Sequence, residues 1–363
     1  MSDKREENSR GSTVRTLDEF LPSPYLTGVF DLSDTESVEL VMARGCSQNC
    51  SYCAIHESPL RYFSFERIRD EIDYIDRHAP KLKDMLITVA DMYENVPLGE
   101  KTLAVLKEFA ERRKVRVLFY VNVSTLTHNS VVRLSDSTFF DVEVGIQSLN
   151  PDVLTTCHRL PDPDKIKRNV ANLQKLAPKA HVYLGLIAFL PGDTAKSYWQ
   201  SLDWAISTKA TVAVNHLRII PGTELYDRCV ARGIKVSPDY PYFVTATDKM
   251  NEQEVSIVSK LTTEIFFSLK VISQSAILHD EFFQLAGSSK KETPYVSLAA
   301  LMAKLWINCD ETRGIYDAFE ESFRKTKSLD HDIRTSHISD NDINVLEKKY
   351  FAFKQIIWKK ISN

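Results

Sequence analysis

The sequence predicts an α/β fold, a partial (βα)6 TIM-like barrel followed by a C-terminal helical cap. Six short runs of β-branched and other apolar residues alternate with segments whose apolar residues recur at helical spacing. The runs are apolar on both faces, which is typical of parallel strands covered by helices. After about residue 236 the runs stop and helical segments follow one another. A barrel and a separate helical region are therefore expected.

The apolar runs locate the six predicted strands. They occupy residues 38–44, 85–90, 115–123, 139–148, 181–189 and 211–220. Right-handed crossovers through the intervening helices would make all six strands parallel. Because a closed barrel of this type has eight strands, six strands predict a curved and partly open barrel. Ligands of such sheets bind at the carboxyl ends of the strands, so the functional site is expected there.

Helices are predicted between the strands and throughout the C-terminal region. The first is well defined, because Ile68, Ile72 and Ile75 recur at helical spacing behind Ser64, a residue type that caps helix N-termini. The other predicted helices between strands are 98–113, 163–176 and 194–208. After the boundary "PDYPYF" the predicted helices are 250–277, 296–308, 313–326 and 340–360.

The chain is expected to have three parts. Residues 1–36 form a polar leader that is expected to be disordered, 37–235 the barrel, and 236–363 a helical region that caps the barrel and contacts the substrate. The N-terminal "MSDKREENSRGST" lacks the apolar segment of a secretory signal. No apolar run approaches the roughly 20 residues of a membrane span. A cytoplasmic protein without a membrane partner is expected.

Composition and charge are those of a globular protein. The formal net charge is -3 and the basic residues are dispersed, so no nucleic-acid partner is expected. In the reducing cytoplasm, clustered cysteines more often bind metals or take part in catalysis than form disulfides.

Three of the six cysteines lie together, directly after the first predicted strand. Cys46, Cys50 and Cys53 have C-x3-C-x2-C spacing, and Tyr52 precedes the third. A structural zinc site usually has a second cysteine pair, which this chain lacks, and a two-cysteine redox motif leaves Cys46 unexplained. Three thiolates suit three irons of a [4Fe–4S] cluster whose fourth iron stays open. The alternative is a non-enzymatic zinc-binding or cluster-binding protein.

With these cysteines the sequence resembles the radical S-adenosylmethionine (SAM) superfamily. The hallmark of that family is C-x3-C-x-aromatic-C in the loop after the first strand of a partial (βα)6 barrel. Further segments resemble its Elp3-like, coproporphyrinogen-oxidase-like and cobalamin-associated branch: "RYFSFERIRDEI", "VEVGIQSLNPDVLTTCHR", "LIAFLPGDTAKSYWQSLDWAI" and "LRIIPGTELYDRCVARGI". The resemblance covers residues 38 to about 250.

The resemblance implies two cofactors, a [4Fe–4S] cluster and SAM, and a reductant such as flavodoxin or ferredoxin. One electron would cleave SAM to methionine and a 5′-deoxyadenosyl radical. The residues that the resemblance places at SAM are Tyr52, Asp91, Asn122, Ser124, Gln147, Arg159 and Ile187. Relatives often place an acid near Gly185 for the ribose hydroxyls, and this chain has none there.

Each polar residue of that set also has a purely structural interpretation. Asp91 could cap the following helix, and Asn122 could end a strand in a turn. Gln147 could satisfy backbone groups at a strand end, and Arg159 could be a solvent-exposed helix residue. His216 is interpreted as a core or strand-end histidine.

The remaining cysteines have different interpretations. Cys157 and Cys229 are interpreted as ordinary buried thiols. Cys309 lies in the predicted helical cap, and some radical SAM peptide epimerases use a cap cysteine as a hydrogen-atom donor. Cys309 is therefore a candidate donor, and a small buried helix residue is the alternative.

The resemblance leaves the substrate open. About forty-five residues precede Cys46 and no D-x-H-x-x-G motif occurs, so cobalamin-dependent methylation by this chain alone is not expected. The leading hypothesis is hydrogen abstraction from a peptide or natural-product substrate, leading to epimerisation, cleavage or rearrangement, as in ribosomal peptide modification. The alternative substrate is a sugar, nucleoside or tetrapyrrole-like small molecule.

Overall fold

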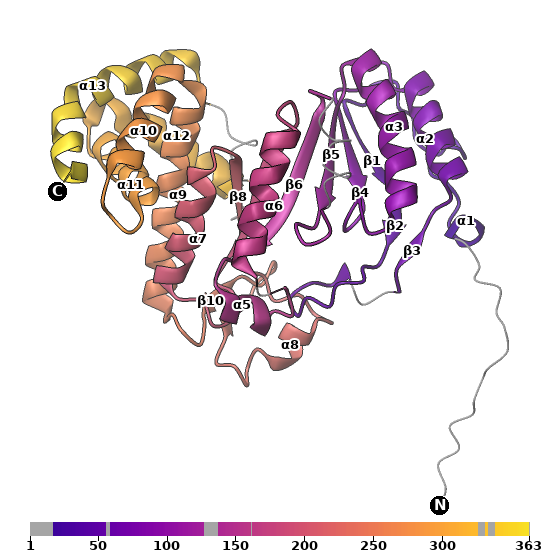
Figure 1. The fold of residues 1–363 in the computed structure, drawn as a ribbon, viewed down its shortest axis with the longest axis horizontal. Helices are drawn as coiled ribbons and strands as arrows, with labels where there is room; N and C mark the ends of the chain where they lie inside the picture. Colours follow the sequence, from indigo (N-terminus) through magenta and orange to yellow (C-terminus); the bar gives the residue numbers. More distant parts are fainter. Residues whose placement is uncertain are drawn as a thin grey trace, which may run out of the picture.

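The computed structural model describes residues 17–55, 59–126, 137–160, 162–325, 331–332 and 338–362 (Figure 1). Six parallel strands form one sheet in chain order, and a two-residue strand, β11 (His331–Asp332), joins its end antiparallel to the last of them. The six are β1 (Ser37–Val41), β4 (Asp84–Thr88), β5 (Arg116–Val121), β6 (Phe140–Gln147), β7 (His181–Ala188) and β8 (Thr211–His216). The predicted partial (βα)6 barrel is confirmed.

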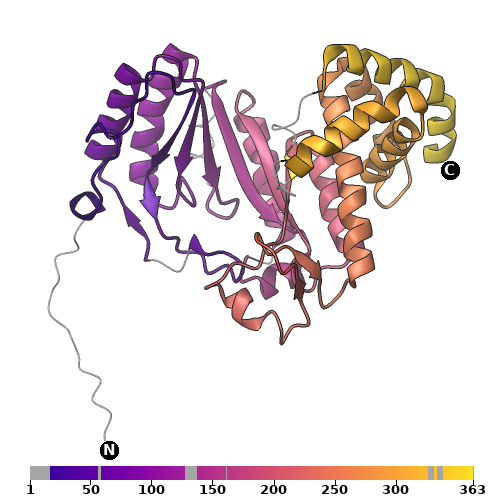
Figure 2. The same ribbon diagram turned by 180° about the vertical axis from the view of Figure 1, so that it is seen from behind.

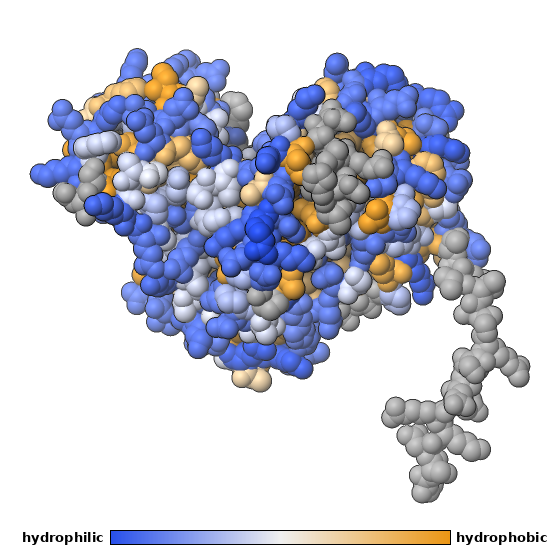
Figure 3. Space-filling model, viewed as in Figure 1, coloured by the Kyte–Doolittle hydropathy of each residue, from blue (hydrophilic) through white to orange (hydrophobic). Residues whose placement is uncertain are grey.

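The helices between the strands cover one face of this sheet (Figure 1). Their bounds are α2 (Phe65–His78), α3 (Val96–Arg113), α6 (Pro163–Leu176) and α7 (Ala195–Ser207). The predicted cap of α2 is present, because the Ser64 hydroxyl accepts a hydrogen bond of 3.1 Å from the amide of Arg67. Helical periodicity and capping residues thus located all four helices. The covering helices expose mostly hydrophilic residues to solvent on this side of the molecule (Figure 3).

The two faces of β6 differ in polarity, which positions the functional site. Val142, Val144 and Ile146 are fully buried on the face that the helices cover. Glu143 and Gly145 alternate with them and therefore point to the other face, which Figure 2 shows from behind. The concave inner face of the barrel thus carries polar groups beside apolar ones.

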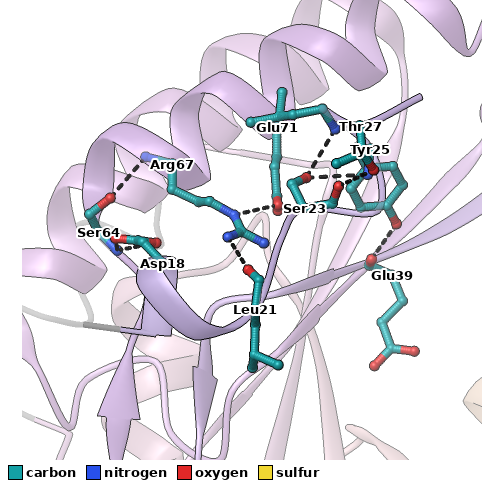
Figure 4. Close-up of polar contacts among 10 residues, drawn as sticks. Asp18, Leu21, Ser23, Tyr25, Thr27, Glu39, Ser64, Arg67 and Glu71 are labelled. Atoms are coloured by element: carbon teal, nitrogen blue, oxygen red, sulfur yellow. Dashed lines mark hydrogen bonds and ion pairs between the residues drawn. The ribbon is translucent and has the colours of Figure 1, made fainter. Parts of the chain in front are cut away.

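Residues 17–36 are not the disordered leader that the sequence predicts. After the short helix α1 (Leu17–Phe20), the apolar side chains of Leu17, Tyr25 and Leu32 are buried in the core. Arg67 of α2 donates a hydrogen bond to the carbonyl of Leu21 (Figure 4). Three widely spaced apolar residues give no periodic signal, so only tertiary contact reveals this segment. Residues 1–16 lie outside the described residues.

The C-terminal region is helical, as predicted. Its helices are α9 (Glu252–Gln274), α10 (Ala276–Ser288), α11 (Pro294–Ile307), α12 (Asp310–Lys325) and α13 (Asp340–Ser362). α10 was not predicted; it begins directly after Ser275, which ends α9 and whose hydroxyl caps α10. These helices pack on the β8 side of the barrel, with α11 against both α7 and α9 (Figures 1 and 2). That they contact the substrate stays a prediction.

Among the described helices, none combines the length and the apolar character that crossing a bilayer requires.

Gly99 of α3 provides a stability prediction. A Cβ atom at this position would lie 2.2 Å from the backbone carbonyl oxygen of Met92, so Gly99→Ala forces the backbone apart. We expect a loss of about 1–3 kcal/mol and a lower melting temperature in thermal unfolding. Gly314→Ala in α12 is the matched control, because nothing lies within 4 Å of its Cβ position and alanine favours a helix. A Gly99→Ala protein that melts at or above the wild-type temperature would contradict the prediction.

Candidate active site

A cavity of about 580 Å³ lies at the carboxyl ends of β1, β4, β5 and β6. Its walls come from these strand ends and from the loop that follows β2 (Ala43–Arg44). This is the position that the parallel topology predicts for a ligand. The cavity has the size of ordinary small-molecule sites, which span roughly 300–1,000 Å³.

All three clustered cysteines line this cavity, and none of the three forms a disulfide. Cys50 is buried, whereas Cys46 and Cys53 are partly exposed. Burial raises the pKa of the Cys46 thiol to about 11, and the nearby Glu94 carboxylate contributes to the increase. The sequence prediction that these thiols share one site therefore agrees with their placement.

Contacts with distant segments hold the cysteine loop. Glu94, in the loop after β4, accepts a hydrogen bond of 2.9 Å from the amide of Ser47. The amide of Ser51 donates to the carbonyl of Cys157 at 3.3 Å, and the carbonyl of Ser51 accepts from the amide of Leu225 at 2.8 Å. Loops from three other βα units thus fix the backbone that carries the thiols.

The donor set fits an iron–sulfur cluster. Among the described residues, no three His, Cys, Asp or Glu side chains converge on a position for a single metal ion. A [4Fe–4S] cluster binds each thiolate to a different iron, so it does not require such convergence. Cys46, Cys50 and Cys53 would hold three irons, with open cavity volume beside them for a second ligand.

Arg159 places a positive charge against the cysteine loop. Its guanidinium donates a hydrogen bond of 2.8 Å to the carbonyl of Gly145 and lies 3.5 Å from both the Cys50 sulfur and the Tyr52 hydroxyl. Arg159 follows the short helix α5 (Pro151–Thr156) and lines the cavity, so the interpretation as a solvent-exposed helix residue is wrong. Tyr52 and Gln147 line the same cavity. Their contacts with SAM stay predictions.

Asp91 is engaged within the fold. Its buried carboxylate accepts hydrogen bonds from the amides of Tyr93 (3.1 Å) and Asn122 (3.2 Å) and from the hydroxyl of Thr125 (2.6 Å). These bonds join the end of β4 to the end of β5. Asp91 does not cap the following helix, because the N-cap of α3 is Asn95. Asn122 itself lines the cavity, and its side-chain oxygen accepts from the amide and the hydroxyl of Ser124.

Four residues of the predicted set are not among the described residues that line the cavity. They are Asp91, Ser124, Ile187 and Cys309. Ile187 lies near the end of β7, and Cys309 directly precedes α12 on the β8 side of the barrel. The roles that the resemblance gives them stay predictions.

Sequence reasoning missed Glu143 as a site residue. A Cβ atom on Gly185 would lie 3.5 Å from a carboxylate oxygen of Glu143, so the neighbouring strand places an acid where the sequence showed none. Glu143 lines the cavity together with Glu39, whose carboxylate accepts a hydrogen bond from Thr88. Strand alternation could have placed Glu143 on the inner face of the barrel, because Glu143 shares a face with Gly145 and Gln147.

His216, at the end of β8, is the strand-end histidine that the sequence predicts. Its imidazole is buried between Phe189 and Phe243, with ring centroids 4.5 and 5.0 Å away. The Nε2 atom donates a hydrogen bond of 2.8 Å to the carbonyl of Val244. Burial lowers the pKa of His216 to about 4, and the charge of Arg218 acts in the same direction.

This buried histidine makes stability depend on pH. Between about pH 4 and the unfolded-state pKa of about 6.5, the unfolded chain binds a proton that the folded chain does not, so His216 lowers stability as the pH falls through this window. His216→Gln should therefore melt below the wild type at about pH 7.5, with a difference that shrinks toward about pH 5.5. Thermal unfolding across this range measures it. A difference that stays constant with pH would refute the assignment.

The comparisons with known proteins agree with this geometry. The domain of the radical SAM superfamily matches residues 40–205. The chain is 30% identical over 230 residues to the cobalamin-dependent radical SAM methyltransferase TokK of Streptomyces tokunonensis, covering 56% of this chain and 32% of TokK. It is 26% identical over 263 residues to the ribosomal protein uS12 methylthiotransferase RimO of Syntrophus aciditrophicus (strain SB), covering 69% and 52%.

A solved structure shares the fold. The cobalamin-dependent SAM radical enzyme OxsB, with aqua-cobalamin and SAM bound, aligns with 90% of this chain and 55% of its own, at 12% identity and a TM-score of 0.50. The chain thus spans about half the length, or less, of these relatives. The domain match, the barrel and the cysteine motif agree with one another: residues 40–205 match the radical SAM superfamily, whose members use a [4Fe–4S] cluster and SAM as cofactors.

Proposed function

We propose that this chain cleaves SAM reductively to methionine and a 5′-deoxyadenosyl radical, which abstracts a hydrogen atom from a substrate held in the barrel. The observation that carries the proposal is the placement of Cys46, Cys50 and Cys53 on one wall of a cavity at the strand ends. The cluster, when bound, supplies the electron that breaks the sulfur–carbon bond of SAM. A reductant such as flavodoxin or ferredoxin would deliver that electron.

The residues of this chain have distinct roles in the proposal. The three cysteines hold the cluster, and Arg159 offsets part of the negative charge that their thiolates bring into the cavity. The bond from Arg159 to the carbonyl of Gly145 fixes the cation between β6 and the cysteine loop. Glu143 lies beside the small residue Gly185, where a carboxylate could accept hydrogen bonds from the hydroxyls of a ribose.

The substrate class that we propose is a peptide or a natural product. TokK is a cobalamin-dependent methyltransferase and RimO a methylthiotransferase by name, and both favour transfer of a methyl or methylthio group over epimerisation as the reaction type. Radical methylation is therefore a second candidate, with cobalamin supplied by a segment or partner other than the residues described. Cobalamin would have to come from elsewhere because this sequence has no D-x-H-x-x-G motif.

Anaerobic reconstitution tests the proposal directly. The protein should turn brown, hold iron and sulfide in equal amounts, and convert SAM to 5′-deoxyadenosine when dithionite is added. A colourless protein that holds one zinc ion and leaves SAM intact would overturn it. To separate the two candidates, the assay is repeated with hydroxocobalamin. Formation of S-adenosylhomocysteine only in its presence would favour methylation, and 5′-deoxyadenosine alone would favour hydrogen abstraction.

Peptide epimerisation would require a hydrogen-atom donor, for which Cys309 stays the predicted residue. Cys309 directly precedes α12, within the helical region. The test is Cys309→Ala with a cognate substrate in D2O. Product that forms at the wild-type rate and still acquires deuterium would refute the donor role.

A further inference from the structure

A second cavity, of about 530 Å³, lies between the starts of β7 and β8 and the helices α9 and α10. None of the described residues that line it also lines the thiol cavity. It lies toward the amino ends of the strands, whereas the thiols lie at the carboxyl ends. Its volume falls within the range of small-molecule sites.

One wall of this second cavity is aromatic. Phe282 and Phe283 of α10 meet edge to face with ring centroids 5.2 Å apart, and His279 lies 4.8 Å from the Phe283 ring. Tyr183 of β7 lines the opposite side. Phe282 is fully buried, so the partly exposed rings of Phe283 and His279 are the ones available to a planar ligand.

The charged residues of the cavity are all basic. Lys209 has its ammonium group 5.0 Å from the centroid of the Phe283 ring, and Lys270 is the second lysine that lines the cavity. Of the described residues that line the cavity, none is an aspartate or a glutamate. This surface therefore attracts an anionic group and places it next to the aromatic wall.

The sheet side of the cavity is held in position by hydrogen bonds. The two ring nitrogens of His181 lie 2.9 Å from the hydroxyl of Tyr183 and 3.0 Å from the hydroxyl of Thr211. On the neighbouring strand β6, the carboxylate of Asp141 accepts a hydrogen bond from the guanidinium of Arg116. These partners leave the His181 ring little freedom to rotate, so the polar groups facing the cavity are pre-organised for a ligand.

The second cavity meets the inner face of the sheet at Tyr183 and extends around the start of β8, where the consecutive residues Thr211 and Val212 both line it. Tyr183 of β7 is the register partner of Glu143 of β6, and partners in parallel strands point to the same side. Glu143 lines the thiol cavity and Tyr183 the second one. The barrel thus carries acidic residues near the thiols and a basic, aromatic region around the start of β8.

We propose that the second cavity binds a small molecule that joins an aromatic ring to an anionic group such as a carboxylate. The ring would pack against Phe283, and the anion would lie near Lys209 and Lys270. This site is separate from the SAM cavity, and its occupation does not depend on the radical reaction. It goes beyond the function proposed above.

Isothermal titration of the reconstituted full chain, under anaerobic conditions, tests this site with naphthalene-2-carboxylate. The expected result is saturable binding to one site that persists in excess S-adenosylhomocysteine. Naphthalene-2-carboxamide, which has the same ring without the charge, should bind about tenfold more weakly. Lys209→Gln should weaken naphthalene-2-carboxylate about fivefold or more, because the cation is lost from the aromatic wall.

Lys196→Gln is the matched control, since Lys196 is an exposed lysine on α7 that pairs with Glu292 outside the cavity. It should bind the probe as the wild type does. Phe283→Leu, which keeps the wall apolar but removes the ring, should also weaken binding. The proposal is overturned by an absence of saturable binding, by displacement with S-adenosylhomocysteine, or by equal affinities for the carboxylate and the carboxamide. Folded Lys209→Gln protein with wild-type affinity would overturn it as well.

Discussion

Cys50→Ala is expected to abolish 5′-deoxyadenosine formation and to leave the reconstituted protein with little colour. Cys50 is buried in the loop that lines the thiol cavity, and Arg159 lies 3.5 Å from its sulfur. Alanine provides no ligand for iron, and the remaining two thiols cannot hold three irons. The measurements are iron and sulfide content, visible absorption and the rate of 5′-deoxyadenosine formation with dithionite. We expect that rate to fall to the background of the assay.

Cys229→Ala is the matched control, because it removes a thiol of the same kind at another buried position. Cys229 follows the short helix α8 (Glu224–Arg228) and is not among the described residues lining the thiol cavity. This variant should load the cluster and cleave SAM as the wild type does. If Cys50→Ala kept wild-type iron content and activity, the assignment of the three cysteines would be wrong.

Arg159→Met is expected to slow SAM cleavage by about tenfold to a hundredfold, which corresponds to the roughly 1.5–3 kcal/mol of a hydrogen bond to a charged group. Methionine keeps an unbranched apolar stem but removes the guanidinium that binds the carbonyl of Gly145. It also removes the positive charge beside Cys50 and Tyr52. Without this cation the site should be harder to reduce, so the midpoint potential should become more negative.

The midpoint potential distinguishes the electrostatic role of Arg159 from a merely structural role. Arg168→Met, at an exposed position of α6, is the control and should change neither the rate nor the potential. The measurements are single-turnover formation of 5′-deoxyadenosine and a redox titration followed by electron paramagnetic resonance. Loss of activity with an unchanged potential would contradict the electrostatic role. Unchanged activity would contradict any role of Arg159 at the cofactor.

The fold could be predicted well from local patterns. Apolar runs and helical spacing located all six barrel strands, and the capping residue Ser64 marked the first helix, because these signals lie within a few residues of one another. The break between α9 and α10 at Ser275 was missed, because the helical pattern resumes directly after it without a connecting loop. Residues 17–36 were missed because their order depends on contacts with distant residues such as Arg67.

The candidate site could be predicted only in part. The spacing of the cysteines identified them, because the motif is local. The sequence also selected Asp91, but its carboxylate bonds to the end of β5, which only the packed sheet shows. Glu143 was missed because its proximity to Gly185 depends on the register between two strands that are nearly forty residues apart in the chain. Proximity across a sheet is a tertiary property.

The anchoring of the cysteine loop has a consequence for biosynthesis. Ser51 is held by the backbone groups of Cys157 and Leu225, which are translated long after the thiols have left the ribosome. At ~5–20 residues per second, roughly ten to thirty seconds separate Cys53 from Leu225. During that time the nascent chain presents three thiols without the backbone contacts that fix them. If an iron–sulfur cluster were delivered before Leu225 emerges, the cysteine loop that receives it would still be flexible. Oxidants could also reach the three thiols during that time.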